Sequence, residues 1–420
     1  MEHDLVVEGR VVLPGSFEPA QIGITDGVIA EVRKQGLKGV RTIHAGDGIV
    51  FPGFIDCHVH LRDPGWPEKE DFGTGSRAAV HGGVTTAFDM PNNPVPANTA
   101  SALRDKQERA KERSVIDIRF FAGVDPNDIP GIRDVSGLAV GYKVYMSETT
   151  GTSPFPEASL GAALRLIAET GKPVSAHCEK QELLAAKLSL AGGSPEEYPD
   201  ARPPSAEMES VETVLAASKK AGVRVNICHV STAGALEKVS KAAASGADAA
   251  CEVTLHHLFF TRRALSGNAM LRTNPPLREE SDRVAVLNGL KAGTVKFLAT
   301  DHAPHTKEEK ATSSIAGVPG LDDYGHMVSW LIRNHDVHPL SIARMTSGNQ
   351  AGFFSLRDRG TLASGMRADI TVLDMTPEVV RSGSIMSKCG WSPYEGVEFP
   401  GRVRWVISRG SPVLEDYQVS

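Results

Sequence analysis

Apolar, β-branched runs alternate with helical segments through the middle of the chain. Eight short runs of strand character lie near residues 54–60, 84–90, 117–123, 139–146, 173–178, 224–230, 249–255 and 296–302. Segments with helical character lie between several of them, at 101–113, 159–170, 206–221 and 281–291. Because eight strands alternating with helices can close on themselves, the pattern predicts an α/β fold, a (β/α)8 TIM barrel over residues 51–359.

The two ends of the chain follow a different pattern. Residues 4–50 and about 360–415 contain short β-type runs with glycine turns, such as Leu5-Val6-Val7 and Trp405-Val406-Ile407, and no convincing long helix. Two ends of the same character that flank a barrel most simply pair with each other. We therefore expect a small composite β-sandwich domain made of residues 1–50 and 360–420.

Composition narrows the class of protein. With 420 residues, 41% hydrophobic and 23% charged, the chain resembles an ordinary soluble globular protein. A net charge of −6 offers no basic surface for nucleic acid, which favours a small-molecule partner. No apolar run reaches membrane-spanning length, and the first residues lack the features of a secretory signal, so we expect a cytoplasmic protein without a membrane partner. Five cysteines without a Cys-x-x-Cys pair indicate reduced thiols.

His58 and His60 stand one residue apart where the first predicted barrel strand ends. Side chains at i and i+2 of a strand point to the same face, so the two imidazoles can bind one cation, and Arg62 continues toward the same side. An isolated pair of this kind is more often two hydrogen-bonded histidines than a metal site. The other strand ends therefore decide between the two interpretations.

In a TIM barrel the carboxyl ends of the strands carry the chemistry. Besides the histidine pair, the predicted strand ends carry Lys143, His177, His229 and Asp301. Nitrogen and oxygen ligands without a required cysteine are typical of zinc or a similar divalent ion, and their number fits two metals better than one. A charged lysine would repel these ions. Lys143 would therefore have to react with carbon dioxide to give a carbamate that can bridge two metals, unless it tethers a loop or a substrate carboxylate.

These residues resemble the amidohydrolase superfamily and, within it, the dihydroorotase family. The resemblance covers essentially the whole chain and rests on several motifs. They are His58-Val59-His60-Leu61-Arg62-Asp63-Pro64-Gly65, Lys69-Glu70-Asp71, Met90-Pro91-Asn92-Asn93-Pro94, Lys143-Val144-Tyr145-Met146, Asn274-Pro275-Pro276-Leu277-Arg278 and Thr300-Asp301-His302-Ala303-Pro304-His305.

The resemblance implies two Zn²⁺ ions per chain, or similar divalent ions. His58, His60 and Asp301 would hold one, His177 and His229 would hold the other, and carboxylated Lys143 would bridge them. Asp301 would also be the catalytic proton shuttle. The implied reaction is the reversible interconversion of L-dihydroorotate and N-carbamoyl-L-aspartate in pyrimidine biosynthesis.

The resemblance also implies a set of substrate-binding residues. Arg62 can bind the carboxylate of dihydroorotate bidentately, unless it is an exposed salt-bridging arginine. Asn93 and His305 would complete the anion pocket, and Asn274 would hydrogen-bond the ring. Thr149 is the candidate contact from a mobile lid, and Pro319 and Gly320 would supply backbone groups.

Three cysteines, Cys57, Cys178 and Cys228, each stand next to a proposed ligand. Strand alternation predicts that they face the helices and act as small buried hydrophobic residues. An additional metal site formed by Cys228 and Glu252 stays open. We interpret His256, His257 and His302 as structural, because six better-placed ligands already serve two metals.

Other functions remain open from sequence. Allantoinases and hydantoinases or dihydropyrimidinases share the metal ligands, but their substrates lack the carboxylate that Arg62 and Asn93 are expected to bind. A catalytically dead scaffold of the same fold would have lost ligands, and this chain has kept them. The resemblance also implies a homodimer, and it is compatible with association with a transcarbamoylase.

Overall fold

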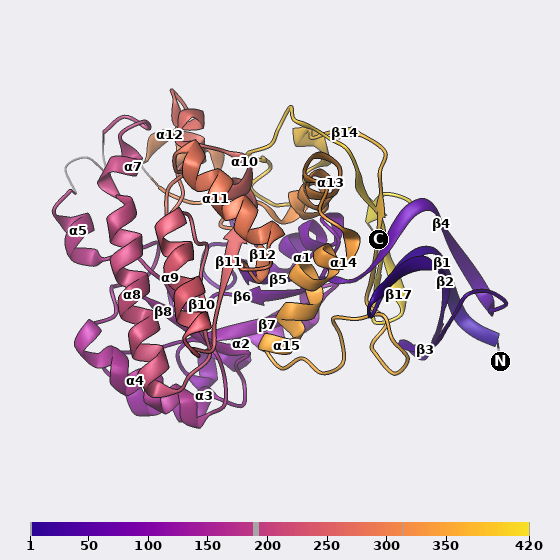
Figure 1. Cartoon of the computed structure of the whole chain (residues 1–420), viewed down its shortest axis with the longest axis horizontal. Coiled ribbons are helices and arrows are strands. Elements are labelled where there is room, and N and C mark those ends of the chain that lie inside the picture. Colours follow the sequence, from indigo (N-terminus) through magenta and orange to yellow (C-terminus); the bar gives the residue numbers. More distant parts are fainter. Residues whose placement is uncertain (1, 188–192, 314, 420) are drawn as a thin grey trace.

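Parallel strands form a barrel at the centre of the molecule (Figure 1). The computed structural model describes residues 2–187, 193–313 and 315–419. Each barrel strand is hydrogen-bonded to the next in chain order. The strands are β5 (Phe54–Val59), β6 (Val84–Asp89), β7 (Asp117–Gly123), β8 (Gly141–Tyr145), β9 (Val174–His177), β10 (Val225–Ile227), β11 (Ala249–Thr254) and β12 (Phe297–Ala299). A parallel bridge between Val59 and His302 joins the first strand to the segment after the last. All eight predicted strands and the TIM-barrel class are confirmed.

Helices surround this barrel and bury their apolar sides on its strands (Figure 1). The four predicted helical segments correspond to α2 (Ala100–Arg113), α4 (Glu157–Glu169), α8 (Pro204–Ala221) and α11 (Glu280–Lys291). Local signals set their ends: Thr99 accepts a hydrogen bond at the start of α2, and Gly222 ends α8 at a φ of +69°. The others are α1 (Phe72–His81), α3 (Ile132–Val135), α5 (Gln181–Ala185), α7 (Tyr198–Ala201), α9 (Ala233–Ala244), α10 (Leu255–Phe259), α12 (Lys307–Thr312), α13 (Tyr324–His335), α14 (Pro339–Ala343) and α15 (Asn349–Phe353). No helix of the described residues is long and apolar enough to cross a membrane.

Both chain ends join in a second sheet at one side of the barrel (Figure 1). Its order is β18-β17-β16-β13-β4-β1-β2-β3. The bounds are β1 (Glu2–Leu13), β2 (Ser16–Thr25), β3 (Val28–Arg33), β4 (Lys38–Pro52), β13 (Ile370–Asp374), β16 (Arg402–Ser408), β17 (Ser411–Glu415) and β18 (Gln418–Val419). A small separate pair is formed by β14 (Glu378–Val379) and β15 (Glu398–Phe399).

One apolar cluster fills the interior of this second sheet. It joins Val7 and Ile22 from the N-terminal strands with Ile370 and Ile407 from the C-terminal ones, so the two halves of the sheet pack on each other. This agrees with the expected composite β-sandwich. The domain boundaries themselves stay a prediction, and residues 1 and 420 lie outside the described part of the chain.

A single residue, Gly53, separates the N-terminal strands of the second sheet from the first strand of the barrel. It lies between β4 and β5, and its backbone N–H donates to the Asp369 carbonyl at 2.8 Å. A Cβ atom at this position would approach the Thr85 hydroxyl to 2.3 Å. Glycine is therefore required for the close approach that fixes the start of β5, the strand that carries the histidine pair.

An ion-pair cluster fastens the C-terminal segment to α13. The His326 ring lies 3.4 Å from Asp323 Oδ1 through Nδ1 and 3.0 Å from Glu378 Oε2 through Nε2. Arg402 also contacts Glu378 at 2.8 Å, and the ring centroid of His81 lies 6.3 Å from that of His326. Burial favours the neutral ring, but the hydrogen bonds to the two carboxylates outweigh it and raise the pKa of His326 to about 9.

We expect the stabilising effect of His326 to disappear at alkaline pH. Its pKa rises from about 6.5 in an unfolded chain to about 9 in the folded one, so folding favours the protonated ring. The contribution, on the order of 3 kcal/mol, is complete below about pH 6.5 and is lost as the pH rises through the folded pKa. Melting temperatures of the wild type and His326→Gln between about pH 6 and 10 should converge as the pH rises. His335→Gln on the same helix is the control, because burial and the nearby charge of Lys291 lower the pKa of His335, so folding does not favour its protonated ring. A constant difference for His326→Gln would contradict the expectation.

Candidate active site

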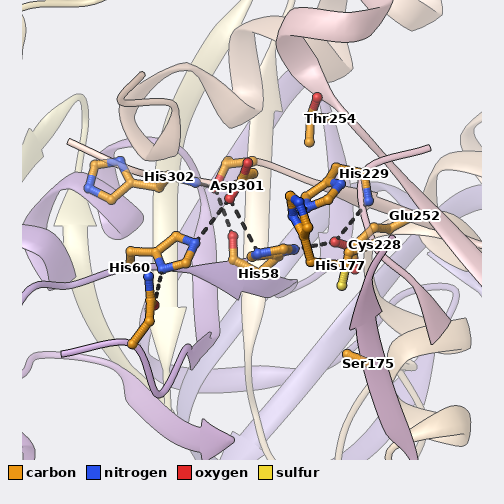
Figure 2. A network of polar contacts seen from close by, with 12 residues as sticks. His58, His60, Ser175, His177, Cys228, His229, Glu252, Thr254, Asp301 and His302 are labelled. Carbon is orange, nitrogen blue, oxygen red and sulfur yellow. Dashed lines mark hydrogen bonds and ion pairs between the residues drawn. The ribbon is translucent and has the colours of Figure 1, made fainter. Parts of the chain in front are cut away.

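The first three predicted ligands meet at one carboxylate oxygen (Figure 2). Asp301 Oδ1 lies 3.2 Å from His58 Nε2 and 3.1 Å from His60 Nε2. All three side chains are buried. Burial raises the pKa of Asp301 against the opposing effects of His58 and Lys143, and burial likewise lowers the pKa of His58 and His60. Neutral imidazoles beside a carboxylate supply the lone pairs that a divalent cation needs.

The second histidine pair lies beside the first. His177 Nδ1 is 3.0 Å from His229 Nε2, and the ring of His229 lies 5.3 Å from that of His58 between centroids. The other nitrogen of His177 contacts Glu179 Oε2 at 2.9 Å, and Arg202 pairs with the same carboxylate. Despite burial, Arg202 and His177 lower the pKa of Glu179 to about 2, so it stays ionised. Glu179 thereby holds the His177 ring with Nδ1 toward the site.

Lys143 completes the group of six. Its Nζ lies 2.9 Å from Cys228 Sγ, and the residue is 1% exposed. One cavity of about 30 Å³ is lined by all six predicted residues: His58, His60, Lys143, His177, His229 and Asp301. The structure therefore brings together every residue of the predicted ligand set. Imidazole nitrogens, a carboxylate and an amine that can be carboxylated are a donor set that fits two zinc-like ions.

Three residues at the ends of these strands adopt left-handed backbone conformations. They are Arg62, His229 and Asp301, with φ of +61°, +36° and +48°. Such conformations are unfavourable for side chains with a Cβ atom and are retained where the surrounding structure holds them. Since β10 ends at Ile227 and β12 at Ala299, the chain turns immediately before His229 and Asp301. The turns aim both side chains into the cavity.

The same local geometry corrects the prediction for two of the three cysteines. A register shift in β5 between Asp56 and Val59 breaks alternation, and Cys57 packs inside the barrel with Phe88 and Phe121. Cys228, beyond the end of β10, contacts Lys143 and so also faces the interior. Cys178 does pack in the layer between strands and helices. All three are buried, as expected.

Glu252 lies to one side of His58, away from His60, and contacts His58 Nδ1 (Figure 2). Its other oxygen accepts a hydrogen bond from Asn226 Nδ2 at 2.7 Å. This contact fixes the His58 ring so that Nε2 faces Asp301. Ligand atoms of His58, Cys228 and Glu252 also lie within 4.8 Å of one another, the spacing of a metal site.

Arg62 is buried beside the ligand group. Its Nε donates to the Pro304 carbonyl at 3.2 Å, and Nη2 lies 3.2 Å from His305 Nε2. Burial, then the charges of Arg62 and Lys69, lower the pKa of His305, so its ring is neutral and accepts this contact. Burial also lowers the pKa of Arg62 to about 10, which leaves it charged at neutral pH. The exposed surface arginine considered from sequence is excluded.

Asn93 does not line the cavity. Its Oδ1 accepts from Lys106 Nζ at 2.7 Å and its Nδ2 donates to the Pro64 carbonyl at 3.0 Å. Asn92 lines the cavity instead, with Oδ1 2.6 Å from His60 Nδ1. Two adjacent asparagines in one loop give no sequence signal for which of them faces the site.

The remaining predicted substrate residues divide in two. Asn274 and Thr149 line the cavity, and the Tyr198 hydroxyl donates to Asn274 Oδ1 at 2.5 Å. Pro319 and Gly320 do not line it. The loop contributes Ala316 and Gly317 in their place, which sequence reasoning missed, along with Tyr145.

The histidines interpreted as structural lie outside the cavity lining. His302 Nδ1 accepts from the Gly320 N–H at 3.1 Å, and His257 Nε2 lies 3.1 Å from the Pro275 carbonyl oxygen. His256 is buried against His257, with ring centroids 4.5 Å apart. The structural interpretation agrees with these positions.

Known proteins resemble the chain over its whole length. The sequence model of the amidohydrolase family matches residues 49–413. A dihydroorotase of Pyrococcus horikoshii is 34% identical over 99% of this chain and 93% of its own length. An allantoinase of Bacillus velezensis is 32% identical over 99% of this chain and 95% of its own. The solved structure of an L-hydantoinase (dihydropyrimidinase) from Arthrobacter aurescens superposes with a TM-score of 0.95 at 26% identity, covering 100% of this chain and 97% of that one.

Proposed function

Because the chain belongs to the amidohydrolase family, we propose that it is a dihydroorotase, which interconverts L-dihydroorotate and N-carbamoyl-L-aspartate in pyrimidine biosynthesis. Relatives named dihydroorotase, allantoinase and hydantoinase all act on cyclic amides, and the chain shares this reaction class. The intact set of six ligands supports an enzyme rather than a scaffold. Since the relatives differ in substrate, the pocket must decide between the rings.

The environment of Arg62 carries the choice of substrate. The residue is 3% exposed, and none of the ion pairs among the described residues involves its guanidinium. A buried cation without a carboxylate partner calls for an anionic ligand, since an unpaired buried charge is unfavourable. Dihydroorotate carries a carboxylate, whereas allantoin, hydantoin and dihydrouracil do not. Arg62 therefore favours dihydroorotate.

The proposed metal ligands follow the geometry of the cavity. His58, His60 and Asp301 would hold one divalent ion, and His177 and His229 a second. The Lys143 amine would add to carbon dioxide, forming an N–C bond and releasing one proton, and the carbamate oxygens would join the two sites. Bound metal would supply an activated water and a polarised amide carbonyl.

Asp301 is the proposed proton shuttle. Its carboxylate lies at the cavity beside both histidines of the first strand, within reach of a water that attacks the ring amide. One carboxylate oxygen would take the proton of that water and give it to the nitrogen that leaves the carbonyl carbon. The same path in reverse closes the ring. Asn92 and the neutral His305 hold His60 and Arg62 in position for this step.

A comparison of four substrates tests the proposal. Zinc-loaded, bicarbonate-treated protein is assayed on L-dihydroorotate, allantoin, hydantoin and dihydrouracil, with a chelator control. We expect chelator-sensitive turnover of dihydroorotate. In Arg62→Met the KM for dihydroorotate should rise roughly 30- to 5000-fold, because the substrate carboxylate loses its partner. This corresponds to a loss of about 2–5 kcal/mol of binding free energy. Arg113→Met is the matched control, since Arg113 is a half-exposed arginine that pairs with Asp63 next to the site.

Each other outcome removes one part of the proposal. Preference for allantoin or another neutral ring keeps the reaction class and discards the substrate. An unchanged KM in Arg62→Met refutes the anion pocket. No turnover of any of the four rings supports the scaffold.

We extend the proposal to a cytoplasmic homodimer, as the family resemblance implies, and to association with a transcarbamoylase, with which the resemblance is compatible. Sedimentation velocity of the purified protein measures whether it forms a dimer. Co-purification from the source cells measures whether a transcarbamoylase associates with it.

A further inference from the structure

Tyr145 stands at the end of β8, two residues after Lys143. Side chains at i and i+2 of a strand share a face, so Tyr145 points toward the same side as the lysine. The Lys143 Nζ lies 5.1 Å from the centroid of the Tyr145 ring, and the ring centroid of His177 is 6.3 Å away. Tyr145 lines the ligand cavity and also a neighbouring cavity of about 590 Å³.

The hydroxyl of Tyr145 has no hydrogen-bond partner among the described residues, although the residue is only 8% exposed. Buried tyrosine hydroxyls normally find an acceptor. Tyr142 donates to the Ile132 carbonyl at 2.6 Å, and Tyr324 donates to the Leu298 carbonyl at 2.9 Å. A phenol at neutral pH is a donor, so Tyr145 presents an unused donor to the site.

Tyr394 shows that the missing partner alone is not sufficient. Its hydroxyl is also buried without a partner in the described part of the chain. Its ring, however, packs against Phe259, Phe260 and Phe399 and lines neither cavity of the site. Tyr145 differs because a ligand in the cavity can reach it.

Few buried donors in the cavity are free for a substrate. Asn92 is engaged with His60 and with the Thr150 carbonyl, to which its amide donates at 2.9 Å. Arg62 uses its Nε and one contact of Nη2 within the protein. Its other guanidinium N–H groups are available to a ligand. Outside the six proposed metal ligands, Arg62 keeps N–H groups beyond these two contacts, and the Tyr145 hydroxyl has no hydrogen-bond partner among the described residues.

We propose that the Tyr145 hydroxyl donates a hydrogen bond to the substrate carboxylate that Arg62 binds, which makes Tyr145 a specificity residue. This inference rests on the proposed function. A carboxylate offers about four acceptor positions, and a bidentate arginine occupies two of them. The remaining positions suit a neutral donor that is already desolvated. Rings without a carboxylate gain nothing from this contact.

Steady-state kinetics of Tyr145→Phe test the assignment, because the change removes one oxygen and keeps the ring. We expect the KM for dihydroorotate to rise about 10-fold, with kcat changed by less than about 3-fold, as for a hydrogen bond to a charged group. Metal content should equal that of the wild type. Tyr394→Phe is the matched control, since it removes a buried, unpartnered hydroxyl elsewhere, and its KM should not change.

Calorimetric binding of orotate and of uracil to the metal-loaded protein gives a readout without turnover. The Kd of orotate should weaken about 10-fold in Tyr145→Phe, whereas the Kd of uracil should stay the same. An unchanged Kd and KM, or equal loss for both ligands, overturns the assignment, and loss of metal would make Tyr145 a structural residue. Wild-type protein that binds orotate but does not hydrolyse dihydroorotate rejects the proposed function separately.

Discussion

We expect Asp301→Asn to lower kcat by roughly 10²- to 10⁴-fold while the protein keeps its metal. Asparagine has nearly the same shape and retains one oxygen beside His58 and His60, which lie 3.2 and 3.1 Å from Asp301 Oδ1. It cannot accept and return a proton at neutral pH, so the shuttle fails even where the ligand is kept. Turnover under saturating dihydroorotate and metal analysis of the same sample measure the two effects separately.

Asp125→Asn is the control for this change. Asp125 lines the neighbouring cavity and not the ligand cavity, so its neutralisation should leave kcat within a few-fold of the wild type. Nearly full turnover in Asp301→Asn would move the proton transfer to another group. Loss of metal in that variant would assign Asp301 chiefly to metal binding.

Lys143→Ala should lose both metal and activity. The residue is almost completely buried among four histidines and Asp301, and alanine cannot form the carbamate that would join the two metal sites. Loss of metal assistance worth several kcal/mol corresponds to roughly a 10³-fold fall in kcat. Metal content should fall from two equivalents per chain, measured by mass spectrometry of the desalted protein.

Lys180→Ala provides the comparison, because Lys180 follows β9 and pairs with Glu157 on the surface. Full metal content and activity in Lys143→Ala would rule out the carbamate.

The metal content of the wild type decides whether an additional ion binds. More than two equivalents would support an additional ion at His58, Cys228 and Glu252, whereas two or fewer would remove that site.

The eight barrel strands and the four helical segments predicted between them were predictable because their signals are local. Short buried runs such as 84–90 and 117–123 become β6 and β7, and the helices begin and end at residues such as Thr99 and Gly222. The six candidate ligands were also predictable, since a parallel barrel brings all strand ends to one face. Because Lys143 and His177 stand near the carboxyl ends of their strands in the sequence, their place in the lining of the ligand cavity could be predicted.

The sequence by itself thus determined the barrel, the sheet from both chain ends and the six candidate ligands that line the cavity. Only the tertiary structure decided which neighbour faces that cavity. The register shift in β5 and the left-handed backbone at His229 turned Cys57 and Cys228 inward, against simple alternation. Lys106, on α2, holds the side chain of Asn93 away from the cavity that Asn92 lines. Side-chain direction beyond a regular strand depends on contacts between distant segments, which hydrophobic periodicity does not encode.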